Sequence, residues 1–331
     1  MLETRKAVEQ QPTLIRKKLI VSHAPFYHSG NRITERSYHT MLAALPALLM
    51  GFYYYGMPAV GVVCLSVASA IFWELVINLA TRRPITIGDG NAALIGLLLA
   101  MLLPATMPWW AVITGSFIAV VIGKQIYGGI GSNAFNPVAV AVAIMMISWK
   151  SFLDFDAMLV NYDLNFATMY PIAAAKYFGA ASAASFSLWK IFLGQQIGGI
   201  GATFGLGLLA GGIYLMLRGY IRWEISLTFL AGVYISAFVF NLAYPSRYAS
   251  PVFHLITGYT LIGAFFLATE DSSSPVNLIP MLIYGGFGGI MTVLIRNIGI
   301  WPDGVLLAIL VCNLINPLLD KISPQALGKV V

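Results

Sequence analysis

Charged side chains are scarce in this sequence. Asp, Glu, Lys and Arg make up 10% of the 331 residues, while 59% are hydrophobic and the mean hydropathy is +0.81. Soluble domains carry roughly 25% charged residues, so this chain has too few to cover a water-exposed surface. The composition excludes a soluble enzyme or binding module. It predicts an all-α polytopic membrane protein, which crosses the bilayer several times.

Cysteine is nearly absent as well. The two cysteines, Cys64 and Cys312, both lie inside apolar runs. Two thiols cannot by themselves ligate an iron–sulfur cluster, and they do not make a disulfide framework. We expect both to be buried as small apolar side chains. The four histidines have no metal-ligand spacing on a helix, so no metal site is predicted.

The motifs of several enzyme classes are also missing. There is no Walker motif and no recognisable catalytic triad, so no catalytic residue is predicted. The first forty residues are polar and basic, without the apolar core of a cleavable signal peptide. The net charge of +6 would suggest a nucleic-acid partner in a soluble chain, but here the positive-inside rule explains it. We therefore expect membrane lipid, and no nucleic acid, around the chain.

Long apolar runs dominate what is present. A helix that crosses the bilayer needs roughly 20 residues, and fewer where the bilayer is thinned or the helix is partly buried. We therefore predict about ten transmembrane helices. The runs are approximately 41–56, 58–80, 91–107, 109–127, 135–149, 202–217, 224–243, 252–269, 276–295 and 303–319.

The basic residues predict how these helices are oriented. With the amino-terminal tail in the cytoplasm, the inside segments hold fourteen Lys and Arg residues and the outside segments five, which together make the nineteen of the chain. Cytoplasmic segments of membrane proteins carry the excess of Lys and Arg. We therefore expect both termini in the cytoplasm and the chain in the cell inner membrane. The aromatic groups at Tyr53–Tyr55 and Trp109–Trp110 then fall at the outer interface, where such residues anchor helices.

One segment interrupts the rhythm of apolar runs. Residues 150–195 are too polar to span, and we expect them to form a large extracytoplasmic loop. Five runs precede this loop and five follow it. The predicted parts are a cytoplasmic basic tail (1–38), a first five-helix half (39–149), the loop (150–195), a second five-helix half (196–320) and a cytoplasmic carboxyl-terminal tail (321–331).

An odd number of spans in each half would make the two halves inverted repeats. Two pairs of fragments resemble each other weakly. The sequence GNAALIG at 90–96 resembles GYTLIG at 258–263, and NAFNP at 133–137 resembles NLINP at 313–317. The members of the second pair fall at different ends of their predicted helices. The repeat is therefore a suggestion only.

The most unusual stretch is Gly198–Thr203, at the start of the sixth apolar run. A helix that begins here has free backbone N–H groups and a positive dipole end, which favour a phosphate group. Glycines at Gly201 and Gly205, and again at Gly207 and Gly211, remove bulk from one face. A flat ring system or a neighbouring helix could lie against it. The plainer alternative is that Thr203 simply caps the helix.

Two carboxylates are candidates for an ion pathway. Glu74 lies near the cytoplasmic end of the second run, where a carboxylate at membrane depth is costly and often functional. It could instead reach the surface or pair with Arg82 or Arg83. Asp89 precedes the third run, where it could cap the following helix or line a path for ions.

Several stretches together resemble one family, over residues 20–319. It is the membrane flavoprotein family shared by the Rnf complex, as its D subunit, and the sodium-pumping NADH:quinone reductase, as its B subunit. Each motif alone is weak, but six in the same order are specific. The matching stretches are 89–104, 108–110, 124–131, 133–137, 199–212 and 265–275.

The resemblance implies a covalently bound FMN. In the family, a flavin transferase outside the cytoplasm esterifies the FMN phosphate to a threonine in a Ser/Thr-Gly-Ala-Thr motif. The matching threonine is Thr203, and Gly199, Gly201, Ala202 and Gly205 are its predicted surroundings. This chain has Ile200 where the strict motif has Ser or Thr. The resemblance also implies a second, non-covalent riboflavin nearer the cytoplasm.

The short amino-terminal tail resembles the Rnf subunit more than the quinone reductase subunit. The resemblance then implies a subunit of a translocase that couples electron transfer between ferredoxin and NAD to movement of Na⁺ or H⁺. Its partners would be other membrane and peripheral subunits, including an extracytoplasmic flavin subunit. Two alternatives stay open: the B-type subunit of a sodium-translocating NADH:quinone reductase, and a flavin-free channel or transporter built from inverted repeats.

Overall fold

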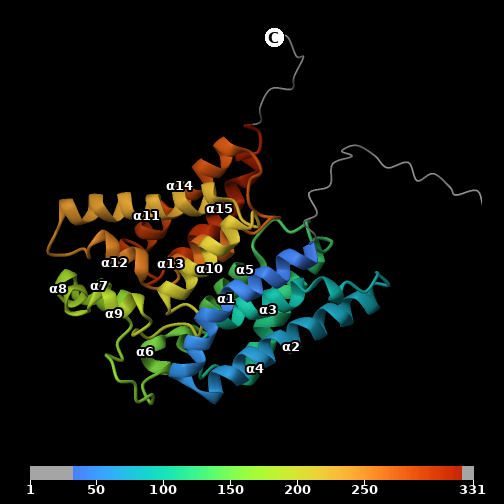
Figure 1. Cartoon of the computed structure of the whole chain (residues 1–331), viewed down its shortest axis with the longest axis horizontal. Helices are drawn as coiled ribbons and strands as arrows, with labels where there is room; N and C mark the ends of the chain where they lie inside the picture. The colour runs from blue at the N-terminus through green and yellow to red at the C-terminus, as the bar shows by residue number, and fades with distance from the viewer. Residues whose placement is uncertain (1–32, 323–331) are drawn as a thin grey trace, which may run out of the picture. The chain divides into compact units, whose positions relative to one another are not determined.

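The computed structural model describes residues 33–322, and every regular element in that range is helical (Figure 1). The main helices are α1 (Ile33–Tyr55), α2 (Met57–Ala80), α3 (Asn91–Leu102), α4 (Trp109–Phe117), α5 (Pro137–Ser148), α10 (Gly205–Leu217), α11 (Trp223–Ala243), α12 (Pro251–Ile256), α13 (Thr260–Ile262), α14 (Leu278–Asn297) and α15 (Val305–Leu319). The π-helical turns are η2 (Ile118–Ile122), which continues α4, and η5 (Gly263–Leu267), which continues α13. The short connecting helices are η1 (Ile87–Asp89), η3 (Gln125–Tyr127), η4 (Lys150–Leu153), α6 (Phe155–Met158), α7 (Pro171–Phe178), α8 (Ala180–Ser185) and α9 (Leu188–Phe192).

The all-helical, multi-pass membrane fold predicted from composition is confirmed. Each of the ten predicted runs contains helix, but the helices differ in length. Four segments are long and apolar enough to cross a bilayer alone: α2, Trp109–Tyr127, α11 and α14. By contrast α3 has 12 residues, about 18 Å at 1.5 Å per residue, and ends short of a hydrocarbon core about 30 Å thick.

Two predicted boundaries differ from the structure. The first helix begins at Ile33, about two turns before its apolar run, so residues 33–38 of the predicted tail are helical. The rest of that tail and residues 323–331 of the carboxyl-terminal tail lie outside the described residues. The eighth run is broken, because α12 ends at Ile256 and α13 begins at Thr260.

Small residues let several helices approach closely. α1 and α10 run antiparallel, since Gly207 lies against Ala47 and Gly211 against Ala43 further back along α1. The neighbouring helix is therefore what occupies the predicted small face of the sixth run. α11 and α14 lie side by side (Figure 1) and pack through glycines such as Gly232 and Gly289.

The pattern of contacts matches two inverted halves. The first segments of the two halves, α1 and α10, pack against each other, and so do the last segments, α5 and α15. Within each half the second segment packs along the fourth, α2 on α4 and α11 on α14. Gly90 and Gly258 both have positive φ just before a short helix, so the first sequence echo has a common backbone role. The second pair of fragments has no common backbone role, because Asn136 is the N-cap of α5 whereas its counterpart Asn316 lies within α15.

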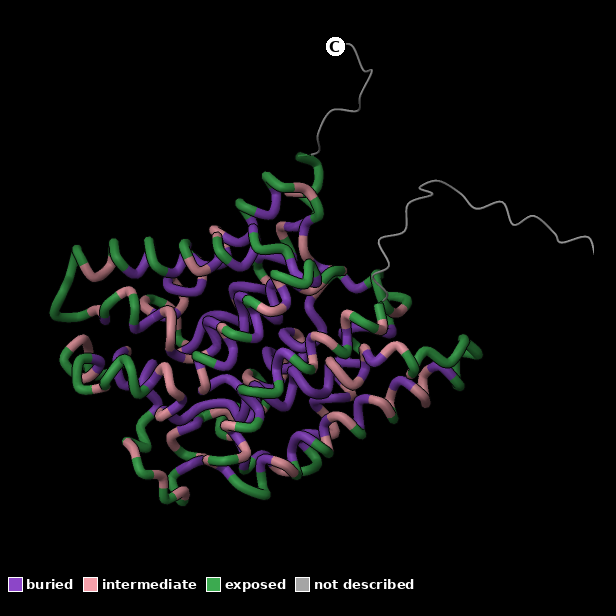
Figure 2. Tube along the Cα trace, viewed as in Figure 1, coloured by how far each residue is buried: buried purple, intermediate pink, exposed green. Residues whose placement is uncertain are grey.

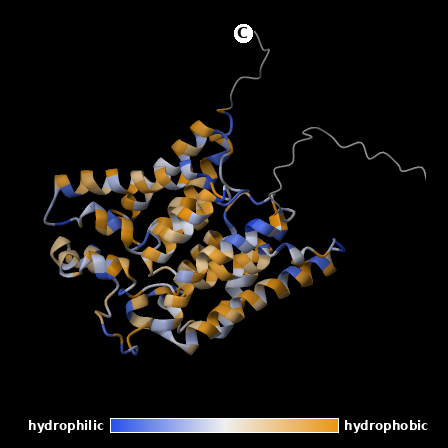
Figure 3. Cartoon of the chain, in the orientation of Figure 1, coloured by the Kyte–Doolittle hydropathy of each residue, from blue (hydrophilic) through white to orange (hydrophobic). Residues whose placement is uncertain are grey.

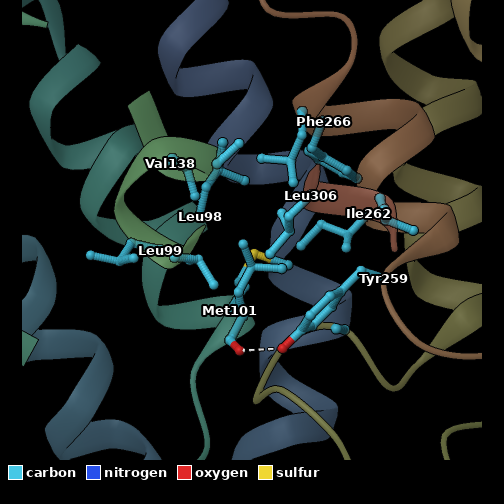
Figure 4. Packing of buried hydrophobic residues seen from close by; sticks show 14 of the residues in the cluster. Leu98, Leu99, Met101, Val138, Tyr259, Ile262, Phe266 and Leu306 are labelled. Atoms are coloured by element: carbon cyan, nitrogen blue, oxygen red, sulfur yellow. Dashed lines mark hydrogen bonds between the residues drawn. The ribbon is translucent and has the colours of Figure 1, made fainter. Parts of the chain in front are cut away.

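The short segments form the buried centre. Figure 2 shows α3, α5 and α13 mostly buried, whereas the long helices bury one side. In Figure 4, Met101 of α3 lies among residues of α5, α13, η5 and α15. These neighbours include Val138, Ile262, Phe266 and Leu306, all nearly inaccessible to solvent.

Hydrophobic residues predominate along the long helices (Figure 3). On α11, Phe238 and Leu242 are exposed, as expected for a lipid-facing surface. Cys64 is exposed on α2, so the prediction that both cysteines are buried is right for Cys312 and wrong for Cys64.

Candidate functional site

The end of the molecule that is predicted to face outward, called the outer end below, is built around the end of α3. α3 stops at Leu102, and Pro104 prevents the helix from continuing. The last carbonyl groups of a helix have no partner within the helix, so they need donors from elsewhere in the protein. The glycine-rich turn after the outer loop supplies donors: the Ile200 amide donates to Leu103 O at 3.0 Å and the Gly201 amide to Met101 O at 3.0 Å. The Tyr259 hydroxyl donates to Leu102 O at 2.7 Å (Figure 4).

This role accounts for two of the predicted site glycines. A Cβ atom on Gly199 would lie 2.6 Å from Met101 O, and one on Gly201 would lie 2.5 Å from the Met101 side chain. Neither contact is tolerable, so the turn needs glycine in order to approach α3. Gly205 faces Phe192 and Leu261.

Thr203 lies just before the sixth helix. α10 begins at Gly205 with Phe204 as its N-cap, so Thr203 precedes the first turn instead of lying within it. Its hydroxyl makes no capping bond, and Oγ1 is buried without a hydrogen-bond partner. The capping interpretation of this residue is therefore wrong. A buried hydroxyl without a partner is unusual and requires an explanation.

A second polar side chain without full pairing lies in the same turn. Gln196 is buried, and its Nε2 donates to Thr203 O at 2.9 Å and to Ile256 O at 3.3 Å. Its Oε1 accepts nothing. Gln196 therefore ties the turn to α12 and leaves an acceptor beside the segment that holds Thr203 and Ala202.

The opposite end, predicted to face the cytoplasm and called the inner end below, holds a buried ion pair. Glu74 on α2 and Lys124 after η2 are 0% and 2% exposed, and Lys124 Nζ donates to Glu74 Oε1 at 2.9 Å. The Thr86 hydroxyl donates to the same oxygen at 2.8 Å, while Glu74 Oε2 has no partner. The alternatives that Glu74 reaches the surface or pairs with Arg82 or Arg83 are wrong.

Asp89 lies close to this pair. Its Oδ1 accepts the Asn91 amide at 2.8 Å, which satisfies the first N–H group of α3, whose N-cap residue is Gly90. Burial raises the pKa of this half-buried carboxyl, and Lys124 opposes the rise. Lys124 is therefore the charge at the centre of this cluster. Sequence reasoning included Lys124 only in the family-matching stretch 124–131. The available signal was that it is the one charged residue of the run 109–127.

A cleft of about 410 Å³ opens at the same end. Arg36 lines it, donating to Thr269 O at 3.0 Å and pairing with Asp271. Its walls carry several amides, and Asn316 Oδ1 is buried there without a partner. The cleft also contacts Phe265 and Phe266 of η5.

A second buried ion pair stabilises the broken eighth segment. Arg296 lies in the last turn of α14, is 1% exposed and pairs with Asp303 at 3.0 Å. Its NH1 donates to His254 O at 2.8 Å, which satisfies a carbonyl group at the end of α12. Asp303 Oδ2 accepts the Tyr259 amide at 2.7 Å, just before α13 begins. Sequence reasoning missed this pair. The available signal was Arg296 itself, one of the five basic residues in the segments predicted to lie outside.

The two ion pairs occupy corresponding places. Lys124 and Arg296 each lie near the end of the fourth segment of their half, one at the predicted inner end of the bundle and one at the predicted outer end. Within residues 33–322, no three His, Cys, Asp or Glu side chains come close enough to hold a metal ion.

Comparison with known proteins gives a consistent answer. The D subunit of the proton-translocating ferredoxin:NAD(+) oxidoreductase complex of Clostridium ljungdahlii is 33% identical over 310 residues, which is 92% of this chain and 94% of that protein. The D subunit of the Na(+)-translocating ferredoxin:NAD(+) oxidoreductase complex of Acetobacterium woodii is 33% identical over 309 residues, 93% of this chain and 94% of its own.

A third relative is the D subunit of the ion-translocating oxidoreductase complex of Aeromonas salmonicida. It is 31% identical over 344 residues and covers 93% of this chain and 98% of its own length. The family model described as NQR2, RnfD, RnfE matches residues 20–328. This chain therefore belongs to the NQR2, RnfD, RnfE family.

Proposed function

We propose that this chain is the D-type membrane subunit of an ion-translocating ferredoxin:NAD oxidoreductase complex. The support is the identity with the D subunits of three such complexes over more than nine-tenths of this chain. Full-length likeness to D subunits favours this proposal over a B-type quinone reductase subunit. Two relatives are named for different ions, protons and Na⁺, so the proposal leaves the ion open.

The proposal places the chain in the inner membrane with both termini in the cytoplasm and residues 150–195 outside. Alone it would not complete the reaction, since it would lack the sites for ferredoxin and NAD. It would work with other membrane and peripheral subunits, including an extracytoplasmic flavin subunit. The support for orientation is the distribution of Lys and Arg across the chain.

The proposal further assigns a covalent FMN to Thr203. The observation that carries it is the buried Oγ1, which has no hydrogen-bond partner. An ester formed there uses a hydroxyl that the fold leaves free. The neighbouring start of α10 has unpaired amides and a positive dipole end, which favour the remaining phosphate charge. The flavin would supply the electron transfer, and the protein its position and potential.

The packing of the turn sets a condition on this attachment. Thr203 is 2% exposed, and Gly199 and Gly201 are already in contact with α3. A flavin transferase would therefore need to reach the hydroxyl while the 198–204 turn is open. We expect attachment to accompany closure of this turn during maturation.

We also assign the second, non-covalent riboflavin to the inner cleft. A volume of about 410 Å³ lies within the 300–1,000 Å³ range typical of small-molecule sites. Asn316 Oδ1, Asn133 and Thr40 offer polar groups to a ring edge or ribityl chain, and Phe265 and Phe266 offer apolar surface.

For the ion, Glu74 is the group we propose to act at the inner end. Its Oε2 is buried and unpartnered, so the carboxylate has an oxygen available for a passing cation or proton. Lys124 compensates its charge when no ion is near. Asp89, whose Oδ1 accepts the Asn91 amide, lies close to Glu74 and Lys124 and would line the same ion path.

In-gel fluorescence tests the flavin assignment. The full chain is coexpressed with its flavin transferase and denatured in detergent, which releases non-covalent flavin but leaves an ester in place. We expect fluorescence from wild type, none from Thr203→Ala, and part of the signal from Thr203→Ser. Thr168→Ala, a threonine of the outer loop, is the matched control and should fluoresce fully. Fluorescence that persists in Thr203→Ala would assign the ester to another residue.

A further inference from the structure

A small basic pocket lies at the outer end, apart from the turn that holds Thr203. It has a volume of about 40 Å³, enough for a few waters or one phosphate-sized group, since a water needs roughly 10–15 Å³. Its charged lining consists of Lys176 on α7, Arg247 between α11 and α12, and Arg296 at the end of α14. Of the described residues that line it, none is acidic.

This clustering is unexpected from the charge distribution. The segments predicted outside hold five Lys and Arg residues, and three of them line this one pocket. Asp303 neutralises Arg296 from the other side, but it does not line the pocket. Lys176 Nζ donates to Gly299 O and Trp301 O, which fixes the ammonium group in place without neutralising it. The pocket therefore carries an excess of positive charge.

Buried polar atoms in the lining also lack partners. His254 is 3% exposed and lines the pocket, and neither of its ring nitrogens has a hydrogen-bond partner. The Nδ2 of Asn297, on the same wall, is also buried and unpartnered. Buried donors without partners are costly, and an anion with several oxygens would satisfy them.

The pocket lies where two span-length helices end. α11 stops at Ala243 and α14 at Asn297. The exposed apolar residues Tyr244, Val252 and Ile298 lie within three positions of lining residues in the sequence. A phosphate group held here would lie at the level of lipid headgroups, above the apolar surface of α11.

We propose that the pocket of Lys176, Arg247, His254 and Arg296 binds a phosphate group, supplied by the headgroup of an anionic phospholipid or by free phosphate. The site goes beyond the proposed electron-transfer function and does not depend on it. Bound phosphate ties α7, the 244–250 connection and the end of α14 together.

Two measurements on the detergent-solubilised full chain test the site. Native mass spectrometry compares retention of phosphatidylglycerol and phosphatidylcholine, and thermal unfolding compares inorganic phosphate with chloride at equal ionic strength. The variants are Arg247→Gln and His254→Phe, which remove a charge and an unpartnered ring. Lys190→Gln is the control, since it removes an exposed charge of the same predicted outer segment that does not line the pocket.

If the phosphate is a lipid headgroup, wild type and Lys190→Gln retain phosphatidylglycerol in preference to phosphatidylcholine. Each pocket variant then binds it about tenfold more weakly, the usual effect of losing one bond to a charged group. If the source is free phosphate, phosphate raises the unfolding temperature of wild type and the control but not of the pocket variants, with no lipid preference. Equal behaviour of wild type and Arg247→Gln in both measurements overturns the proposal.

Discussion

At the residue scale, the buried charges carry the clearest consequences. Glu74 and Lys124 neutralise each other away from solvent, so removing one leaves the other buried and unpaired. Such a loss typically costs about 3–5 kcal/mol, whereas removing both can be neutral. A defect in Glu74→Gln alone would therefore mix instability with any loss of transport.

The double variant separates these effects. We expect Glu74→Gln to lower the abundance of the chain in the membrane, and Glu74→Gln with Lys124→Met to restore it. Ion transport by the complex should stay impaired in both, because the carboxylate is missing in both. Transport is measured in vesicles and normalised to abundance. Normal transport per molecule in the double variant would show that Glu74 serves structure only.

A second residue-scale prediction concerns how stability depends on pH, and it involves Asp156 in the loop predicted to lie outside. Burial raises the pKa of Asp156, whose Oδ1 accepts the Tyr170 amide at 2.6 Å. Protonation therefore favours the folded state, and this contribution is complete below the unfolded pKa of 3.8 and lost as pH rises through the folded value. Asp156→Asn keeps the acceptor and removes the charge.

We expect Asp156→Asn to match wild type near pH 4 and to be slightly more stable near pH 7, by less than about 1 kcal/mol. Thermal unfolding in detergent at the two pH values measures the difference. A variant that is less stable than wild type at neutral pH would contradict the assigned direction.

At the element scale, the end of α3 explains why the glycine-rich turn has its sequence. Gly199→Ala places a Cβ atom against the Met101 carbonyl, so the turn must move and its hydrogen bonds to α3 weaken. We expect a loss of about 1–3 kcal/mol, typical of overpacking. Thermal unfolding measures it. Gly61→Ala on α2 is the control, since nothing lies within 4 Å of its added Cβ atom, and it should be neutral or stabilising.

The end of α3 also shows what the sequence could and could not predict. The apolar runs located the membrane segments, because hydropathy depends on composition alone. They did not reveal that α3 ends halfway, since Leu102 and Leu103 continue the apolar pattern through the break. The glycines were singled out as surroundings of a ligand, whereas the structure shows two of them packed against Met101, about 100 positions away in the sequence.

The same limit applies to the charges. Sequence reasoning recognised Glu74 as costly and considered its nearest basic residues, Arg82 and Arg83. Its partner Lys124 is 50 positions away, and tertiary packing alone brings them together. The resemblance singled out Thr203, but only the structure showed that its hydroxyl is buried without a partner.

At the scale of the whole molecule, the orientation in the membrane follows from charge and can be tested directly. In a chain whose native cysteines are replaced, Lys190→Cys should react with an impermeant thiol reagent in intact cells, and Arg83→Cys only after lysis. Both positions are exposed, so access to each side decides the outcome. Labelling of position 83 but not of position 190 in intact cells would invert the proposed topology.

The central claim, a covalent flavin on Thr203 in a translocase subunit, has a direct test in peptide mass. Trypsin cleavage after Lys190 and Arg218 releases a peptide, 191–218, in which Thr203 is the sole serine or threonine. Wild-type chain purified with its complex should yield this peptide with the added mass of one FMN ester. Thr203→Ala should yield it unmodified. An unmodified wild-type peptide from a complex matured by an active transferase, or the FMN mass on a different peptide, would contradict the account.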